Sequence, residues 1–479
     1  MLLDHLDSDH EVLIEASSGN VVTVGAIRDR GEPIGEMPRG LAFLLADGTM
    51  DAAFWFLALL EARFPVALID AGSEWPTVAR LIDRYRPDMI IDPAGRHLGE
   101  HLASPLGPSG RIIEQSVWLA SEFGPELHGD LAVLLTTSGS TGSPKFVRLS
   151  SANIRANAEQ IVHSLGIIET DRAVTVLPLF YSFGMSVITS HALAGSSVLV
   201  TSSSVIEEAF WSSLHRHGVT FLPGVPTTYT MLKRLGFESR ELPKLRALIQ
   251  AGGRLAPTLI GFFHDVMARR GGQFIVMYGQ TEASPRMSCM PSTNLPTKLG
   301  SVGLAMRGSE FVVCSPGGEE LATGQVGEVV YCGPNVMMGY AEGRDDLTLG
   351  ATHGRVLVTG DLGYLDDEGF LYLTGRSKRI CKLAGSRVSL DEIEQIAGGL
   401  SVVPREIIAV SCDDEKVVLF ATGIDPAEAS DLRKGLAAQL RVPPMLIEVR
   451  TIAAIPLLPS GKPDYTGLAR SAGARADRI

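Results

Sequence analysis

The sequence predicts an α/β protein with a large N-terminal domain of α/β sheets, a small β-subdomain and a small α+β C-terminal domain. From about residue 40 to residue 350, short apolar runs alternate with helical segments, which is the pattern of sheets covered by helices. Near Glu328 the strand-like runs become separated by short polar turns, as is typical of antiparallel hairpins. After Arg376 the chain again alternates between strand and helix candidates.

The predicted strands are short apolar runs bounded by turns or helices. In the large domain they lie at 66–69, 89–91, 131–135, 173–177, 197–200, 245–249 and 274–277. The hairpin strands lie at 328–331, 355–359 and 370–374, and the C-terminal strands at 407–411 and 416–421. Helices are predicted at 391–397, after a capping residue at Ser389, and at 427–440. The most apolar stretch, Ala52–Ile69, is interrupted by Glu61, Arg63 and Pro65, which argues against a membrane span. It is typical of a buried helix followed by a strand.

Composition excludes several classes of protein. With 45% hydrophobic and 20% charged residues, the 479-residue chain can bury a core, and its net charge of −12 argues against a nucleic-acid surface. The five cysteines are dispersed and include no C-x-x-C pair, which indicates reduced cytosolic thiols. The N-terminus carries acidic residues early in the chain, which argues against a secretory signal peptide. We therefore expect a cytoplasmic protein with no membrane span.

One stretch, Leu134–Lys145, indicates a phosphate ligand. It reads L-L-T-T-S-G-S-T-G-S-P-K and follows the apolar run Leu131–Leu135. Glycines let the backbone approach a ligand closely, and unpaired N–H groups form an anion-binding nest, so a triphosphate is the leading ligand. A flexible surface linker is the alternative, because Ser/Gly/Thr-rich segments often serve as linkers.

Spacing excludes two other phosphate-binding loops. A Walker-type loop has four residues between its glycines and then Gly-Lys-Ser/Thr, whereas Gly139 and Gly142 are three apart and Lys145 follows Pro144. The dinucleotide-binding pattern G-x-G-x-x-G is absent from this stretch.

Three further motifs carry residues suited to nucleotide chemistry. In M-Y-G-Q-T-E-A, Thr281 and Glu282 follow a predicted strand and can hold a phosphate oxygen and Mg²⁺. In T-G-D-L, Asp361 can accept hydrogen bonds from two vicinal ribose hydroxyls. In P-S-G-K, Lys462 can offset the charge that develops during attack at phosphorus. Each motif alone is also compatible with a solvated loop.

Together with the block Gly375–Glu394, these motifs resemble the adenylate-forming superfamily of acyl-CoA synthetases, luciferase-like enzymes and adenylation domains of peptide synthetases. Five ordered motifs match between residues 134 and 462. The family's phosphate loop ends in Pro-Lys-Gly, whereas this chain has Phe146 in place of the glycine. The resemblance implies an N-terminal adenylate-forming domain over residues 1–377 and a mobile C-terminal lid domain over residues 378–479.

The resemblance also implies roles for single residues. The catalytic residues would be Lys462, Glu282, Thr281 and Lys382, with Glu282 as the Mg²⁺ ligand. The nucleotide-binding residues would be Thr137, Ser138, Gly139, Ser140, Thr141, Gly142, Lys145, Gly252, Gly253, Tyr278, Asp361 and Arg376. Lys378 would be the hinge, and Gly385 and Arg387 would lie in the thiol-side loop. We expect Arg379 and Arg405 on a solvated basic face.

The candidate residues of the substrate pocket are Tyr181, Phe183, Ala251 and Gly279. Tyr181 falls where amino-acid-activating members of the family carry an aspartate for the α-ammonium group, and many acyl-CoA synthetases a histidine. An ammonium group without a partner in a partly apolar site would cost about 1–3 kcal/mol or more. The expected substrate is therefore a small carboxylic acid without an α-amino group.

The function implied by the resemblance is a two-step, ATP- and Mg²⁺-dependent acid–thiol ligation. The carboxylate attacks the α-phosphate to give acyl-AMP and pyrophosphate, and the acyl group passes to a phosphopantetheine thiol of CoA or of a separate acyl carrier protein. An amide-forming ligase with an amine acceptor is the nearest alternative. A non-catalytic nucleotide-binding protein is a more remote one, against which the intact Glu282 and Lys462 argue.

Overall fold

The computed structural model describes residues 2–97, 110–114, 116–136, 145–383, 386–401, 403, 405–412, 416–459 and 461–473. The chain divides into two compact units, one of Met1–Glu310 with Tyr331–Leu357 and one of Phe311–Val330 with Val358–Ile479. Within the described ranges, no helix is both long and apolar enough to cross a membrane.

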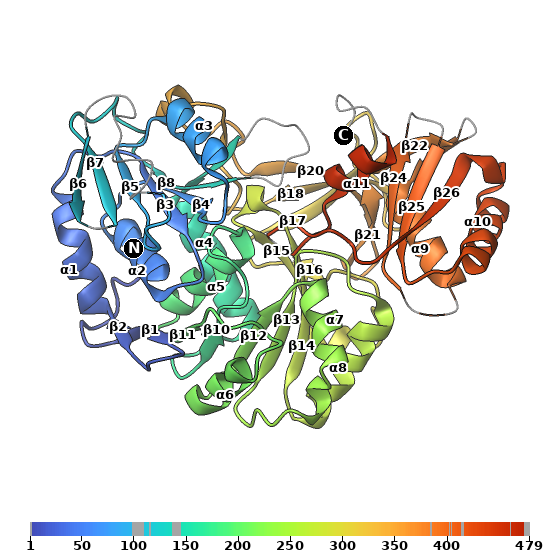
Figure 1. Cartoon of the computed structure of the whole chain (residues 1–479), viewed down its shortest axis with the longest axis horizontal. Helices are drawn as coiled ribbons and strands as arrows, with labels where there is room; N and C mark the ends of the chain where they lie inside the picture. Colours follow the sequence, from blue (N-terminus) through green and yellow to red (C-terminus); the bar gives the residue numbers. More distant parts are fainter. Residues whose placement is uncertain are drawn as a thin grey trace. The chain divides into compact units, whose positions relative to one another are not determined.

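The first unit contains an eight-stranded sheet with a parallel centre and antiparallel edges (Figure 1). In spatial order its strands are β19 (Gly339–Ala341), β9 (Phe146–Ser150), β8 (Leu131–Thr136), β4 (Val66–Asp70), β3 (Ala42–Ala46), β5 (Met89–Ile91), β7 (Val117–Ala120) and β6 (Gly110–Glu114). Strands β8, β4, β3 and β5 pair in parallel, whereas β19, β9, β7 and β6 make antiparallel pairs.

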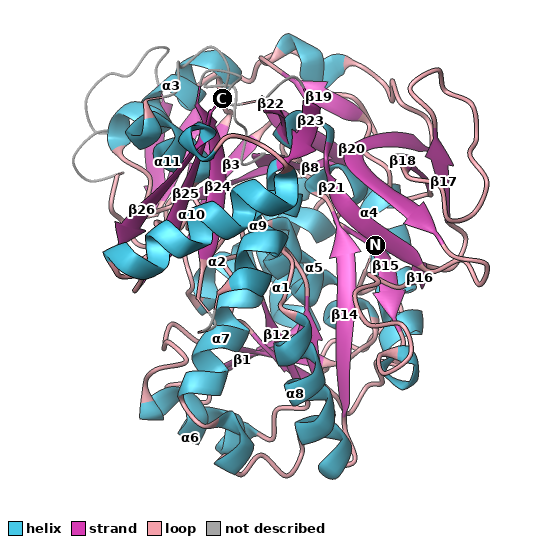
Figure 2. Cartoon of the chain, turned by 90° about the vertical axis from the view of Figure 1, so that its right-hand side faces the viewer, coloured by secondary structure: helices cyan, strands magenta, loops and turns pink. Residues whose placement is uncertain are grey.

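The first unit also contains a nine-stranded sheet. In spatial order its strands are β16 (Leu304–Ala305), β15 (Arg286–Met290), β14 (Gln273–Gly279), β13 (Ala247–Gln250), β12 (Phe221–Gly224), β10 (Arg172–Val174), β11 (Ser197–Val200), β1 (Glu11–Glu15) and β2 (Val21–Thr23). The strands from β14 to β1 are parallel. Figure 2 shows the long strand β14 beside helix α8 (Pro257–Arg269). Because β13 and β14 are parallel, the residues that follow them emerge at the same edge of the sheet.

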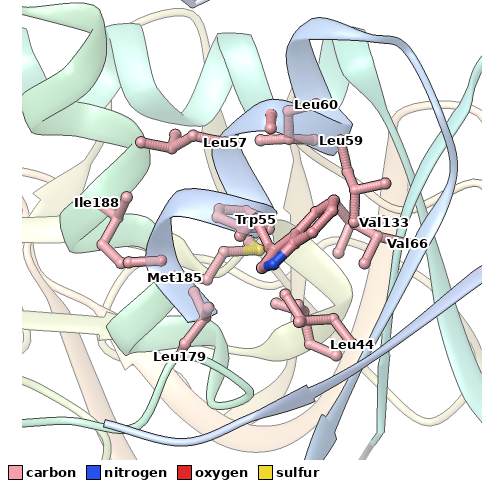
Figure 3. Packing of buried hydrophobic residues seen from close by; sticks show 14 of the residues in the cluster. Leu44, Trp55, Leu57, Leu59, Leu60, Val66, Val133, Leu179, Met185 and Ile188 are labelled. Atoms are coloured by element: carbon pink, nitrogen blue, oxygen red, sulfur yellow. The ribbon is translucent and has the colours of Figure 1, made fainter. Parts of the chain in front are cut away.

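Helices α2 (Met50–Glu61), α4 (Ser151–Leu165) and α5 (Ser182–Leu193) lie between these two sheets (Figure 1). Helix α2 contacts β3 and β4 of one sheet and β1 of the other, and α4 contacts β8 and β15. Figure 3 shows the shared core, in which Trp55 and Leu59 of α2 pack with Met185 and Ile188 of α5. A helix covered on both sides must be apolar nearly all round, which explains the composition of Ala52–Ile69.

Helices α1 (Val24–Gly35), α3 (Trp75–Tyr85), α6 (Glu208–His217) and α7 (Pro226–Arg234) complete the first unit. Helix α3 packs on the eight-stranded sheet in a second core, which includes Phe146. Phe146 is fully buried, and its ring centroid lies 6.3 Å from that of Phe43 and 4.7 Å from that of Tyr85. The residue that replaces the glycine of the family's loop is therefore part of the core.

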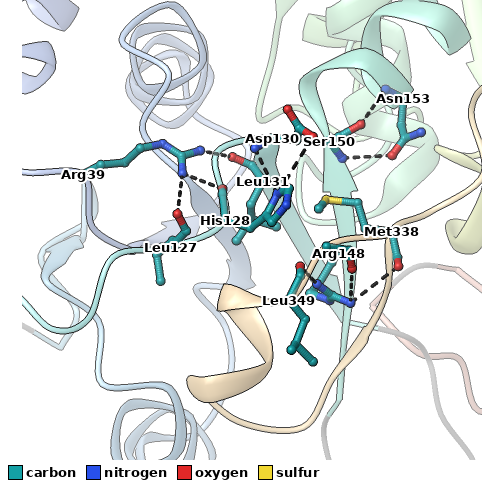
Figure 4. A network of polar contacts seen from close by, with 11 residues as sticks. Arg39, Leu127, His128, Asp130, Leu131, Arg148, Ser150, Asn153, Met338 and Leu349 are labelled. Atoms are coloured by element: carbon teal, nitrogen blue, oxygen red, sulfur yellow. Dashed lines mark hydrogen bonds and ion pairs between the residues drawn. The ribbon is translucent and has the colours of Figure 1, made fainter. Parts of the chain in front are cut away.

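A polar network fixes the edge of the eight-stranded sheet (Figure 4). Arg148 of β9 is 1% exposed and donates hydrogen bonds to the carbonyl oxygens of Tyr340, Met338, Leu349 and Gly350. These bonds tie β9 to the segments before and after β19. Nearby, Ser150 and Asn153 form a reciprocal capping box at the start of α4, with both hydrogen bonds 3.0 Å long.

The second unit holds three small sheets. The first has four strands in the order β17 (Glu310–Cys314), β18 (Gly327–Cys332), β20 (Val356–Leu365) and β21 (Leu371–Arg376). A hairpin of β22 (Ile380–Leu383) and β23 (Ser386–Ser389) follows, and then the sheet β24 (Ile407–Cys412), β25 (Lys416–Thr422) and β26 (Ile447–Ile452). Helices α9 (Leu390–Leu400) and α10 (Pro426–Leu440) cover one face of this last sheet, and α11 (Tyr465–Ala472) covers the other.

The predicted fold class is confirmed, and every predicted strand run overlaps an observed strand. The predicted buried helix and strand within Ala52–Ile69 are α2 and β4. Strand β12 was not predicted, because Pro223 lies within it and proline is depleted in central strands. Pro223 is tolerated because β12 pairs with β10 only at Phe221. On its other side, β12 pairs with β13 along its whole length. Ser389 caps α9 by position, but its side chain makes no capping hydrogen bond.

We expect Phe146→Ala to lower the free energy of unfolding by about 3–5 kcal/mol, because it removes a fully buried aromatic ring from a packed core. Urea unfolding followed by circular dichroism measures this change. As a matched control, Ile168→Ala removes a side chain that is 56% exposed and should stay within about 0.5 kcal/mol of wild type. Equal effects of the two substitutions would contradict the assignment of Phe146 to the core.

Candidate active site

The candidate phosphate loop connects two strands of the eight-stranded sheet. Strand β8 enters it after Thr136, β9 begins at Phe146, and these two residues are directly paired. The predicted positions Thr137, Ser138, Gly139, Ser140, Thr141 and Gly142 lie outside the described residues. The predicted buried strand before the loop is confirmed, because β8 is buried from Leu131 to Leu135.

Lys145, Tyr340 and Glu282 form a connected group in the first unit. The Lys145 ammonium lies 3.9 Å from the centroid of the Tyr340 ring, a cation–π contact. The Tyr340 hydroxyl donates a hydrogen bond of 2.9 Å to Oε1 of Glu282. Burial, and then the charge of Glu282, raise the pKa of Tyr340 above its ordinary value, so the phenol keeps its proton at neutral pH. Tyr340 therefore orients one carboxylate oxygen of Glu282.

Thr281 is held between two structural elements. It begins a 3-10 turn, Thr281–Ala283, one residue after Gln280 and close to the end of β14. Its hydroxyl lies 3.1 Å from that of Ser182, the first residue of α5. In the same turn, the carbonyl of Glu282 accepts a 2.9 Å hydrogen bond from the backbone N–H of Met337. The hydroxyl and carboxylate predicted to act together are thus fixed side by side.

The predicted pocket residues Tyr181, Phe183 and Ala251 belong to one apolar cluster. Tyr181 immediately precedes α5, its ring meets that of Phe183 edge-on at 6.4 Å, and burial raises its pKa to about 12. Gly252 has a φ of +85°, and a Cβ there would lie 2.5 Å from the Tyr181 hydroxyl oxygen, so both conformation and space require glycine.

The loop Ala251–Gly253 follows β13. The Gln250 side-chain amide donates a 2.8 Å hydrogen bond to the Gly253 carbonyl, and the Ala251 N–H donates one of 3.2 Å to Gly224. These bonds hold the glycine pair at the edge of the sheet where β13 ends.

Tyr278 and Gly279 end strand β14. Tyr278 is 9% exposed, and its hydroxyl accepts a 3.4 Å hydrogen bond from the Gln280 amide. Gly279 pairs with Arg286 of β15, and a side chain at Gly279 would collide with the Pro285 carbonyl. Gly279 therefore lies in a tight antiparallel crossing.

In the second unit, Asp361 and Arg376 are directly paired across β20 and β21. The Nε atom of Arg376 donates a 2.9 Å hydrogen bond to Oδ1 of Asp361. Asp361 is 3% exposed, whereas 58% of the Arg376 side chain is exposed. Asp361 therefore lies within a strand and not in a turn, and its carboxylate is oriented by a cation at the surface.

The predicted hinge block begins with the 3-10 turn Ser377–Arg379 and continues into the hairpin β22–β23. In that hairpin Lys382 and Arg387 are direct backbone partners. The side chains of Lys378, Lys382 and Arg387, and all of Gly385, lie outside the described residues.

The expectation for Arg379 and Arg405 was wrong. Arg379 pairs with Asp391 and Glu394, and its guanidinium lies 4.2 Å from the centroid of the Tyr465 ring. Arg405 is only 6% exposed at its side chain and pairs with Glu428 at 3.1 Å. Both arginines stabilise the fold of the second unit, because carboxylates from distant segments reach them.

Lys462 lies on a tight turn of the second unit. The Leu458 N–H donates a 2.7 Å hydrogen bond to the Lys462 carbonyl, and Gly461 has a φ of +76°. Residues Leu457 and Pro463 form an isolated antiparallel bridge at the base of the turn. The predicted glycine turn is therefore present, and Lys462 follows Gly461 in it with a half-buried side chain.

Sequence reasoning missed two functional candidates, Tyr340 and Arg286. Neither lies in a motif with a diagnostic spacing, and Tyr340 is 58 residues from the carboxylate that it contacts. The only local signal for Arg286 was an arginine within an otherwise uncharged stretch, Ala283–Met290.

The fold and this arrangement of motifs define an adenylate-forming enzyme. A model of the family described as "AMP-binding enzyme" matches residues 39–341, and the chain belongs to that family. The chain is 29% identical over 414 residues to oxalate–CoA ligase of Arabidopsis thaliana, covering 80% of this chain and 76% of the relative. It is 31% identical over 350 residues to sulfoacetate–CoA ligase of Cupriavidus necator, covering 72% of this chain and 67% of the relative.

Among solved structures, the chain resembles o-succinylbenzoate CoA synthetase (MenE) from Bacillus subtilis in complex with OSB-AMP. The TM-score is 0.75 with 21% identity, covering 97% of this chain and 96% of that chain. Several other CoA ligases and synthases are matched over about half of their own length, 51–55%. These findings confirm the predicted superfamily and agree with the predicted class of AMP-forming acid–thiol ligase.

We expect the stability linked to Tyr340 to fall at alkaline pH. Its pKa is raised in the folded protein, so the unfolded chain releases this proton at lower pH than the folded chain. The linked stability is therefore complete below about pH 10, the ordinary value for tyrosine, and is lost as pH rises further. Urea unfolding between about pH 8 and 11 should show a steeper loss for wild type than for Tyr340→Phe. Identical slopes would mean that Tyr340 titrates normally.

Proposed function

We propose that the protein activates a small carboxylic acid with ATP and Mg²⁺ and transfers the acyl group to the thiol of CoA. In the first step a carboxylate oxygen bonds to the α-phosphorus as the bond to the pyrophosphate leaving group breaks. In the second step the thiol sulfur bonds to the acyl carbon, AMP leaves, and the thiol proton is released. The observation that carries the proposal is the group of Lys145, Tyr340, Glu282 and Thr281 in the AMP-binding family's matched region.

Glu282 suits a magnesium site. Among the described residues only Tyr340 contacts its carboxylate, at Oε1, which leaves Oε2 for a cation. Mg²⁺ commonly takes one or two protein carboxylates and completes its shell with water and substrate phosphates, so a cluster of acidic residues is not required. When bound, the ion would neutralise charge on the phosphates. Tyr340 would keep the carboxylate turned toward them.

The remaining polar groups suit the other parts of a nucleotide. Thr281 would donate to the α-phosphate, and its contact with Ser182 fixes its hydroxyl. Lys145 would contact the outer phosphates, and its ammonium group lies against the Tyr340 ring. Tyr278 and the Gly252–Gly253 pair would lie beside the adenine, and Asp361 with Arg376 would bind the ribose.

The pocket residues support an acid without an α-amino group. Tyr181, Phe183 and Ala251 offer no negative charge, and the guanidinium of Arg286 lies over the Phe183 ring at 4.7 Å. An α-ammonium group would be repelled there and would lack a partner. The relatives named above act on oxalate and sulfoacetate, which likewise carry no amino group.

For the acceptor, we propose CoA in preference to a carrier protein or an amine, because the matched relatives are named as CoA ligases. The C-terminal lid, residues 378–479, would exchange Lys462 for the hairpin of Lys382 and Arg387 between the two steps, with Lys378 as the hinge. The five cysteines are all free thiols, which agrees with a cytoplasmic location.

We expect Lys462→Ala to lower acid-dependent ATP–pyrophosphate exchange by at least about 100-fold, because a positioned cation at the reacting phosphate would be lost. The control is Lys434→Ala, which removes another lysine of the second unit whose side chain is 66% exposed. That variant should exchange at the wild-type rate. Normal exchange by Lys462→Ala, with both variants folded, would contradict the assigned role.

Replacing Lys378 by proline should separate the two half-reactions, because proline fixes φ at the proposed hinge. We expect pyrophosphate exchange close to wild type and thioester formation reduced by at least about 10-fold. Lys378→Ala removes the same side chain but leaves the backbone free, so it should retain both half-reactions. Thioester formation is measured with CoA, a carrier protein or an amine as acceptor. Equal loss of both half-reactions in Lys378→Pro would argue against a hinge at this residue.

A further inference from the structure

Arg286 is a buried cation without a described anionic partner. It lies on β15, is 2% exposed, and its Nε donates a 3.1 Å hydrogen bond to the Ser186 hydroxyl. Its Nη1 lies 3.3 Å from the sulfur of Met277, and its guanidinium lies over the Phe183 ring at 4.7 Å. Burial lowers the pKa of Arg286 to about 9, which reflects how poorly this surrounding supports its charge.

Arg344 and Arg148, which are also buried among the described residues, have different surroundings. Arg344, also 2% exposed, makes a 2.7 Å ion pair with Asp88. Arg148, 1% exposed, donates to four backbone carbonyls, and Figure 4 labels two of these acceptor residues, Met338 and Leu349. A guanidinium has five N–H donors, and Arg286 has one hydroxyl and one thioether as acceptors among the described residues. It therefore retains donors for a further acceptor.

Hydrogen bonds from two asparagine side chains hold the backbone of Arg286 in place. The side chain of Asn157, which is 1% exposed, accepts from the Arg286 N–H at 3.3 Å and donates to its carbonyl at 2.7 Å. A second amide, that of Asn335, donates to the same carbonyl at 3.1 Å. A fixed backbone makes the guanidinium a preorganised binding group.

The position of Arg286 links it to the candidate active site. Arg286 is the direct cross-strand partner of Gly279, so its side chain points to the face that a Gly279 side chain would occupy. On that face it reaches Met277, two residues before Gly279. Thr281 follows Gly279 by two residues, and it contacts Ser182 in the first turn of α5, the helix that also supplies Phe183 and Ser186. The guanidinium and the Thr281 hydroxyl thus border the same pair of elements, β14 and α5.

We propose that the acid activated by this protein carries a second anionic group, a carboxylate or a sulfonate, and that Arg286 binds it. This inference rests on the proposed acid activation. The first carboxylate attacks the α-phosphate beside Thr281 and Glu282, and the second anionic group forms a charge-assisted, bidentate pair with the guanidinium. Binding gives the buried cation its missing counter-charge. An acid with a neutral or apolar tail leaves that cation unpaired and is rejected.

The test compares matched acids in ATP–pyrophosphate exchange with the wild-type protein. The pairs are succinate with butyrate, phthalate with benzoate, and sulfoacetate with acetate, which separates carboxylate from sulfonate and aliphatic from aromatic acids. We expect kcat/KM for at least one dianion to exceed that of its matched monoanion by at least about 10-fold, as for a desolvated charge pair. Equal or lower values for every dianion would overturn the proposal.

Substitutions locate the preference at Arg286. Arg286→Met should lower the ratio of kcat/KM for the dianion to that for its matched monoanion by about 10-fold or more, and Arg286→Lys should keep part of this preference. Arg155→Met is the matched control, because half of that side chain is exposed on α4 and it should change nothing. If Arg286→Met lowers exchange with all acids equally, or keeps the preference, Arg286 is a structural residue only.

Failure of the proposed function gives a different result. No exchange with any acid counts against acid activation itself. The anion site is then tested by the melting temperature of wild type, Arg286→Lys and Arg286→Met with each acid and no ATP. A rise in wild type with a dianion, absent in Arg286→Met, supports the site, and no rise with any dianion contradicts it. If Arg286→Met does not fold, Arg286→Lys and the wild-type comparison decide both questions.

Discussion

The burial of helix α5 constrains the rest of the candidate active site. The helix lies between two sheets, so even its polar residues are buried, and several of them donate hydrogen bonds to carbonyl oxygens of the helix itself. Ser186 donates to the Phe183 carbonyl and Ser190 to the Ser186 carbonyl, both at 2.7 Å. His191 donates to the Val187 carbonyl at 2.9 Å, and burial lowers its pKa to about 4, so it is neutral at physiological pH. A helix confined in this way cannot rotate without breaking both cores.

Because α5 is fixed, its first turns hold residues of the candidate active site in place. Ser182 holds Thr281, and Phe183 and Ser186 hold the Arg286 side chain. Arg148 donates a hydrogen bond to the Tyr340 carbonyl of β19, and the Tyr340 hydroxyl contacts Glu282. The hydroxyl of Thr281 and the carboxylate of Glu282, which we propose to act at the phosphates, are therefore positioned by residues that do not belong to their motif. This is the preorganisation that electrostatic catalysis requires.

The second unit organises its own residues by different means. In this unit the geometry around the two candidate residues is fixed locally. The β20–β21 pairing positions Asp361, and the turn at Gly461 positions Lys462. Its arginines contribute to stability, since Arg379 joins Asp391, Glu394 and Tyr465. Charged residues near a functional block are thus not automatically ligands. Their role follows from which carboxylates the fold brings to them.

The sequence alone determined the fold class and most of the central strands, and it singled out Thr281, Glu282, Asp361 and Lys462 as candidate site residues. Hydrophobic periodicity and short motifs are local properties, so they can be recognised without knowing which segments meet. Only the tertiary structure decided that Phe146 is a core residue, that Tyr340 orients Glu282, and that Arg286 is buried without a described carboxylate partner. Each of these depends on contacts between segments far apart in the chain. Burial and charge pairing are set by such contacts, and no local pattern encodes them.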